Sequence, residues 1–174
     1  MSHRVFVGQQ QLPDITDQLG AFHFVVGIIL NQQISGERAW RGVESLADRV
    51  DLSPRSVATI DVHVLAHHLA QAPAVHPFTS AMGFAICDAG HRIVTEFGGD
   101  ARNIWKNCDS HGLIKRLTAF RQIGHHKALV ARHLLTMGYG VISAGSEWHA
   151  VDILCPSLDR LLSTSASDEQ PLHT

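Results

Sequence analysis

Residues 117–128, LTAFRQIGHHKA, contain the end of one helix, a tight turn and the start of a second helix. Leu117 and Phe120 complete the apolar face of the first helix, and Gly124 supplies a turn residue without a Cβ. An apolar-periodic run begins at Lys127 and predicts the second helix. Backbone N–H groups and the helix dipole make such an N-terminus attractive to anions, above all phosphate. The stretch therefore predicts a helical hairpin that can hold a phosphate.

The order of residues in this turn resembles the helix-hairpin-helix motif of DNA-binding proteins, usually written Leu-Pro-Gly-hydrophobic-Gly-x-x-x-Ala. The counterparts in this chain are Phe120, Arg121, Gln122, Ile123, Gly124 and Ala128. The resemblance implies that the turn contacts double-stranded DNA. The candidate DNA-binding residues are Arg121, Gln122, Ile123, Gly124, His125, His126 and Lys127. The alternative is an ordinary helical hairpin with a glycine turn.

The charge distribution favours a nucleic-acid surface around this hairpin. The whole chain has a formal net charge of −2, but residues 102–133 carry seven Lys and Arg against one acid, Asp109, a net charge of +6. These basic residues are Arg102, Lys106, Lys115, Arg116, Arg121, Lys127 and Arg132. A basic segment around a phosphate-binding hairpin is typical of nucleic-acid binding, whereas the alternative is a solvated helical surface.

Composition sets limits on the class of protein. With 45% hydrophobic and 17% charged residues, the 174-residue chain has the composition of a globular protein. The longest apolar run, residues 24–30, is too short to span a bilayer, so no membrane association is expected. Cys87, Cys108 and Cys155 are widely spaced and form no C-x-x-C pair, which argues against an iron–sulfur cluster and fits reduced thiols in the cytoplasm.

The remaining sequence predicts an all-α fold, with only residues 5–7 resembling a strand. Helical periodicity indicates helices over about 15–34, 37–50, 61–71 and 80–97, and shorter helical segments begin near Ser53, Asp100 and Ser157. Ser110 is the expected cap of the first hairpin helix. We expect residues 1–162 to form one compact domain and residues 163–174 a disordered tail. Within this domain, an alternative division gives two lobes, one from residues 22–135 and one from residues 1–21 with 136–162.

Short motifs outside the hairpin extend the resemblance over about residues 19–162. They are Asn31-Gln32-Gln33-Ile34, Ala39-Trp40, Pro73-Ala74-Val75-His76, Ser80-Ala81-Met82, Gly98-Gly99-Asp100 with Trp105, and Ala150-Val151-Asp152. Their order and spacing resemble a small bacterial branch of the helix-hairpin-helix base-excision DNA glycosylases, the HhH-GPD or endonuclease III superfamily. The resemblance implies an all-helical fold with a DNA-binding cleft and a role in base-excision repair.

Enzymes of this kind extrude a base from the duplex into a pocket. By resemblance, Gln33 is the side chain that wedges into the space the base leaves. Asn31 and Gln32 offer amide donors and acceptors that can contact a base edge. The alternative is that this polar run only terminates a helix.

The chain departs from the resemblance at its catalytic positions. Bifunctional members carry a lysine two residues after the second hairpin glycine, where this chain has His126, so a Schiff-base lyase is disfavoured. Their catalytic aspartate lies about 20 residues after that glycine, where this chain has Ala144. The nearest candidate carboxylates are Glu147 and Asp152. DNA binding is therefore better supported than cleavage, and any activity should be that of a monofunctional N-glycosylase.

Two alternatives remain open. One is a catalytically silent DNA-binding or damage-sensing protein with the same fold. The other is a metal-dependent hydrolase that uses His63 and His67, which are four residues apart on an expected helix. Because the pattern supplies no third ligand beside this pair, we expect neither a metal site nor a cofactor.

Overall fold

The computed structural model describes residues 4–141, which form a mostly helical structure, as the sequence predicts. The helices are α1 (Gln18–Leu30), α2 (Gly36–Ala47), α3 (Pro54–Thr59), α4 (Val62–Ala70), α5 (Thr79–Glu96), α6 (Ser110–Thr118) and α7 (His125–His133), with η1 (Ala101–Ile104) and η2 (Leu134–Gly138). Within these residues the strands are β1 (Phe6–Val7) and β2 (Gln10–Gln11), paired antiparallel.

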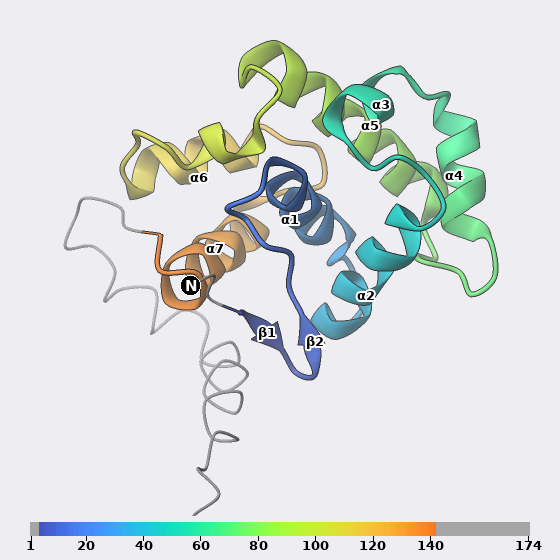
Figure 1. Cartoon of the computed structure of the whole chain (residues 1–174), viewed down its shortest axis with the longest axis horizontal. Coiled ribbons are helices and arrows are strands. Elements are labelled where there is room, and N and C mark those ends of the chain that lie inside the picture. The colour runs from blue at the N-terminus through green and yellow to red at the C-terminus, as the bar shows by residue number, and fades with distance from the viewer. Residues whose placement is uncertain (1–3, 142–174) are drawn as a thin grey trace, which may run out of the picture.

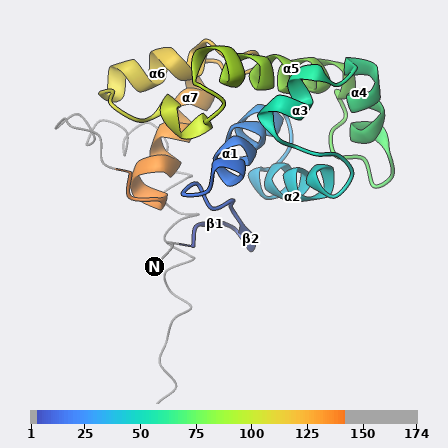
Figure 2. The same ribbon diagram turned by 45° about the horizontal axis from the view of Figure 1, so that its top comes forward.

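Helix α1 is the centre of the described structure. Figures 1 and 2 show it between α2 on one side and α7 on the other. Nine of its residues are buried, from Ala21 to Leu30, which is the pattern of a helix covered on all sides. Phe24 stacks on Trp40 of α2 with ring centroids 5.6 Å apart. A Cβ at Gly27 would lie 1.9 Å from the Trp40 ring, so glycine is required for this close approach of the two helices.

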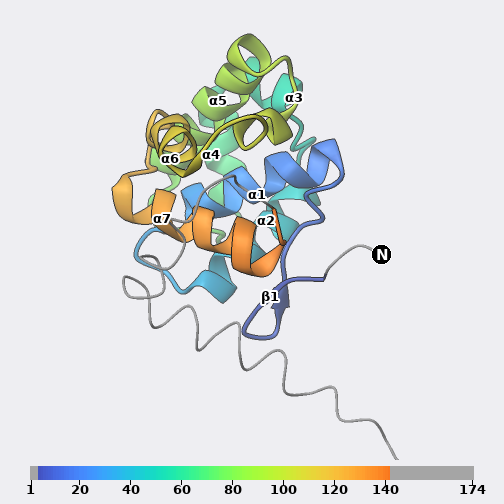
Figure 3. The same ribbon diagram turned by 90° about the vertical axis from the view of Figure 1, so that its left-hand side faces the viewer.

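Helices α3, α4 and α5 form a second group. The 18-residue helix α5 packs against both α3 and α4, to the right in Figure 1 and away from α6 and α7. Figure 3 shows α3 and α5 on the side of α1 opposite the β-hairpin. η1 then leads the chain back to α6, and α6 packs on α7.

Side chains cap most of these helices at their N-termini. Asp17, Ser35, Ser53, Asp61 and Asp100 each accept a hydrogen bond from a backbone N–H in the first turn of the helix that follows. The prediction for α6 was wrong by one residue. Asp109 caps this helix by accepting from the N–H of Gly112 at 2.7 Å, whereas Ser110 is buried and its Oγ accepts a hydrogen bond from Arg132.

Helix α1 also differs from its expected span of 15–34. It ends at Leu30, so residues 31–35 form the loop that leads to α2. The polar side chains of Asn31, Gln32 and Gln33 therefore lie on a loop. Among the described helices, none is both long and apolar enough to cross a membrane. The expected catalytic candidates Glu147 and Asp152, residues 142–162 of the expected second lobe and the tail 163–174 lie outside the described residues.

Candidate nucleic-acid interface

The two segments that the sequence analysis singled out separately line one pocket. Its volume is about 420 Å³. One wall consists of the loop after α1, with Asn31, Gln32 and Gln33. The other consists of the hairpin turn and the start of α7, with Gln122, Gly124, His126 and Lys127. These walls are about 90 residues apart in sequence, so the fold brings the candidate base-contacting residues next to the candidate phosphate-binding turn.

The loop after α1 has a strained backbone at the residue proposed as the wedge. Asn31 ends α1, and its N–H donates to the Gly27 carbonyl at 3.1 Å. Two residues later, Gln33 has φ 56°, in the left-handed region that L-residues with a side chain rarely adopt. Gln33 is exposed. Strained, exposed residues of this kind are concentrated at functional sites.

His76 holds this loop in place. Its imidazole is fully buried, and Nδ1 accepts the N–H of Phe78 at 3.0 Å. Nε2 therefore carries the hydrogen of the neutral ring and donates it to the Gln32 carbonyl at 3.0 Å. Burial is the main reason why the pKa of His76 lies below 6.5, and the charges of Lys127 and Arg38 lower it further. A neutral histidine thus joins the segment before α5 to the loop after α1.

Lys127 was expected to point outward and bind phosphate, but its side chain points into the protein. The residue is only 8% exposed, and its Nζ donates to the carbonyls of Ile29 and Gln122, each at 2.8 Å. The Ile29 carbonyl belongs to the last turn of α1, where carbonyls need donors and the dipole favours a cation. Burial lowers the pKa of Lys127 to about 8, while the two carbonyl acceptors favour the ammonium form. Lys127 is therefore a positioning residue that ties both walls of the pocket together.

In the hairpin turn, the left-handed backbone conformation belongs to Gln122 and not to Gly124, the residue expected to form the turn. Gln122, at the position of the motif's first glycine, has φ 64°. Gly124 has φ −81° and ψ −178°, an extended conformation open to any residue, and it occupies the N-cap of α7. A Cβ built on Gly124 meets no described atom within 4 Å. Among residues 4–141, nothing covers the space over this helix N-terminus and no side chain caps it.

The other expected DNA-binding residues divide into two groups. Ile123 is 2% exposed and its side chain packs in the core, so any contact of this residue with DNA would have to be made by its backbone. His125, His126 and Arg121 are exposed. The guanidinium of Arg121 lies 4.5 Å from the ring centroid of Phe84, an α5 residue that is itself 48% exposed.

Much of the basic charge of residues 102–133 serves the fold. Arg102 pairs with Asp100 at 2.8 Å. Arg116 donates to three backbone carbonyls, those of residues 103, 104 and 106, and Arg132 donates to Ser110. The basic side chains of this segment that stay exposed are Lys106, Lys115 and Arg121. The protein surface therefore carries fewer of these positive charges than the net charge of +6 for residues 102–133 suggested.

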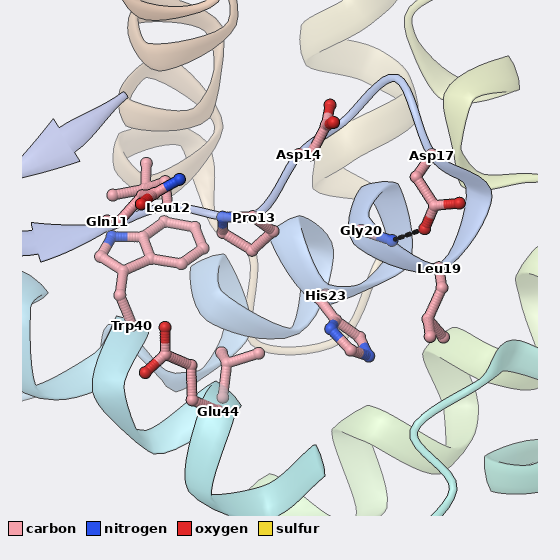
Figure 4. Close-up of a pocket in the computed structure, with 11 residues that line it drawn as sticks. Gln11, Leu12, Pro13, Asp14, Asp17, Leu19, Gly20, His23, Trp40 and Glu44 are labelled. Atoms are coloured by element: carbon pink, nitrogen blue, oxygen red, sulfur yellow. Dashed lines mark hydrogen bonds between the residues drawn. The ribbon is translucent and has the colours of Figure 1, made fainter. Parts of the chain in front are cut away.

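A second pocket, of about 430 Å³, lies between the segment after β2, the start of α1 and α2 (Figure 4). Its lining includes the carboxylates of Asp14, Asp17 and Glu44 and no Lys or Arg from the described residues. Asp17 caps α1 through Gly20, at 3.0 Å, and Glu44 accepts from Gln10 at 2.9 Å. An acidic lining of this kind repels phosphate, so this pocket does not extend the candidate interface.

The described residues contribute no carboxylate to the pocket between the loop and the hairpin. The expected catalytic candidates, Glu147 and Asp152, lie outside these residues. The alternative metal site gains no support either. Within residues 4–141, no group of three or more His, Cys, Asp or Glu is placed to hold a metal ion, and this includes His63 and His67.

Sequence reasoning missed the roles of His76 and its neighbour Phe78. His76 entered only as part of a motif, and its position against Gln32 depends on a contact across 44 residues. Phe78 is 45% exposed, and its ring centroid lies 5.7 Å from that of His76. An exposed aromatic ring beside the loop offers a surface on which a nucleobase can stack.

A comparison with models of known protein families finds no match, and neither does a comparison with curated proteins.

Proposed function

We propose that this chain is a DNA-binding protein of the helix-hairpin-helix glycosylase type that recognises a damaged or mismatched base in double-stranded DNA. One observation carries the proposal: Asn31, Gln32 and Gln33 share a pocket with Gln122, Gly124 and His126. Amide side chains suit base edges, and an open helix N-terminus suits the adjoining phosphate. The sequence motifs of the two walls support the same assignment.

The α7 N-terminus is suited to this role because nothing in the described structure covers it. Gly124 leaves its surface open, and the side chains of His125 and His126 are exposed beside it. Exposed Arg121 adds a cation to the same turn. Lys127 contributes indirectly, since it fixes the distance between the turn and the end of α1.

If the protein is an enzyme, it is a monofunctional N-glycosylase. The position of the family's Schiff-base lysine holds His126, and the amine of Lys127 is engaged with two carbonyls. The second candidate is a protein that recognises damage without cleaving, and a specific observation favours it: the described pocket lining has no carboxylate to stabilise a cationic sugar or activate water.

The test measures affinity and base release on a panel of duplexes with uracil, hypoxanthine, alkylated or oxidised bases, or an abasic-site analogue. A preference for one modified duplex over the matched intact duplex is expected, and Gln33→Ala should reduce that preference while non-specific affinity persists. Strand breakage only after alkali would identify the glycosylase, whereas selective binding without release would identify the silent reader. Equal, weak binding of every duplex would contradict the proposal.

A further inference from the structure

A narrow basic groove of about 190 Å³ lies along α2, next to the loop that carries Gln33. Its lining includes Arg38, Arg41, Gly42 and Ser45 of α2 and residues 73–75 of the opposite segment. The groove adjoins the candidate interface, since α2 follows directly from the loop and the charge of Arg38 acts on His76. None of these groups belongs to the hairpin.

The groove is preformed. The Arg49 guanidinium holds the segment that leads into the wall at residues 73–75 by donating to the carbonyls of His68, Gln71 and Pro73 at 2.7–3.0 Å. A Cβ on Gly42 would lie 2.9 Å from Val75 Cγ1, so glycine allows α2 to approach this wall so closely. A ligand would therefore enter a groove whose width is already set.

The groove presents donors and positive charge without a competing anion at Arg38. Arg38 is exposed and forms no ion pair within residues 4–141, whereas Arg41 pairs with Glu37 at 3.1 Å. A guanidinium fork and the Ser45 hydroxyl match the oxygens of a phosphate group, and the groove is too small for a base pair.

We propose that this groove is a second backbone subsite, in which Arg38 binds a phosphodiester of the duplex whose other contacts lie at Gln33 and the hairpin. The inference rests on the proposed function. It adds a phosphate contact at α2 to the one at the α7 N-terminus, and Gln33 lies on the loop that leads directly to α2.

The test measures duplex affinity by fluorescence anisotropy as a function of salt for the full chain, Arg38→Gln and Arg55→Gln. Arg55 is an exposed arginine of α3 that lines a different pocket, so it is the matched control. Arg38→Gln should weaken binding about fivefold at low salt and lower the salt slope by about 1, because one phosphate contact is lost. Unfolding curves of both variants should match that of the wild type.

The outcomes separate the two proposals. If the wild type binds duplex DNA and Arg38→Gln behaves like Arg55→Gln, the groove is not a phosphate subsite, while the proposed function stands. An equal loss in both variants shows only a general charge effect and also overturns the groove assignment. If the wild type binds no duplex, the proposed function is wrong and the groove assignment falls with it.

Discussion

The ammonium group of Lys127 donates a 2.8 Å hydrogen bond to the carbonyl of Ile29, 98 residues earlier in the chain. The same nitrogen donates to the Gln122 carbonyl in the hairpin turn. One buried side chain therefore joins the end of the central helix to the turn opposite it. The geometry of the candidate interface depends on this link, although Lys127 itself is turned away from any phosphate at the α7 N-terminus.

Replacing Lys127 with methionine should lower the free energy of unfolding by about 2 kcal/mol or more, because the buried Ile29 carbonyl and the partly buried Gln122 carbonyl lose a charged donor. Lys115→Met, at an exposed position of α6, should change it by no more than about 0.5 kcal/mol. Urea unfolding of both variants measures the difference. Equal stabilities would show that the Lys127 contacts contribute nothing to the fold.

Gln122→Gly should stabilise the protein by about 0.5–1 kcal/mol. The left-handed conformation strains a residue that has a Cβ, and relief of this strain outweighs the extra backbone entropy that glycine loses on folding. Ala119→Gly is the matched substitution at an ordinary helical φ of −74° in the same connection. It should destabilise the protein by up to about 1 kcal/mol. Destabilisation by Gln122→Gly would mean that the glutamine side chain makes a contact that outweighs its backbone strain.

Two substitutions at Gly124 separate helix capping from anion binding. Serine and aspartate both suit an N-cap with φ −81° and ψ −178°, and each should raise stability by a few tenths of a kcal/mol, about the gain of a cap over glycine. Gly124→Asp should nevertheless weaken duplex binding far more than Gly124→Ser, because a carboxylate would face the phosphate. Anisotropy titrations measure both affinities. Equal affinities would exclude a phosphate at this helix end.

Acid should destabilise the protein partly through His76. Because the pKa of His76 lies below 6.5 in the folded state, the unfolded chain binds more protons as the pH falls below that value. The neutral ring's contribution is thus complete above pH 6.5 and is lost as the pH falls through the folded-state pKa. His76→Gln should flatten this part of the stability profile, measured by urea unfolding between about pH 7 and pH 5. His111→Gln, at an exposed position of α6, controls for the substitution itself. An unchanged slope in His76→Gln would contradict the role of the ring.

The sequence allowed the helical fold and the residues of both walls of the pocket to be predicted, because helix starts and helical periodicity are local signals. The helices that Ser53, Asp61 and Asp100 cap begin where the sequence predicts them. The direction of Lys127 could not be predicted in the same way. It depends on the Ile29 carbonyl, which reaches the hairpin only through tertiary packing.

The strength of the basic surface was overestimated for a related reason. A charge count cannot distinguish an arginine that donates to carbonyls of its own fold from one that faces solvent. Arg116 is an example of the first kind and Arg121 of the second. The role of His76 likewise depends on the loop at Gln32, which lies far from it in sequence.

Hydrogen exchange of the full chain, with and without a duplex that contains an abasic-site analogue, tests the central claim most directly. The account predicts that the duplex protects backbone amides in residues 31–35 and 122–127, on the two walls of one pocket. The amides of Gln11, Leu12 and Asp14, which line the acidic pocket of Figure 4, should be unaffected. Protection of the acidic pocket, or no protection at the loop and hairpin when the duplex is bound, would contradict the account.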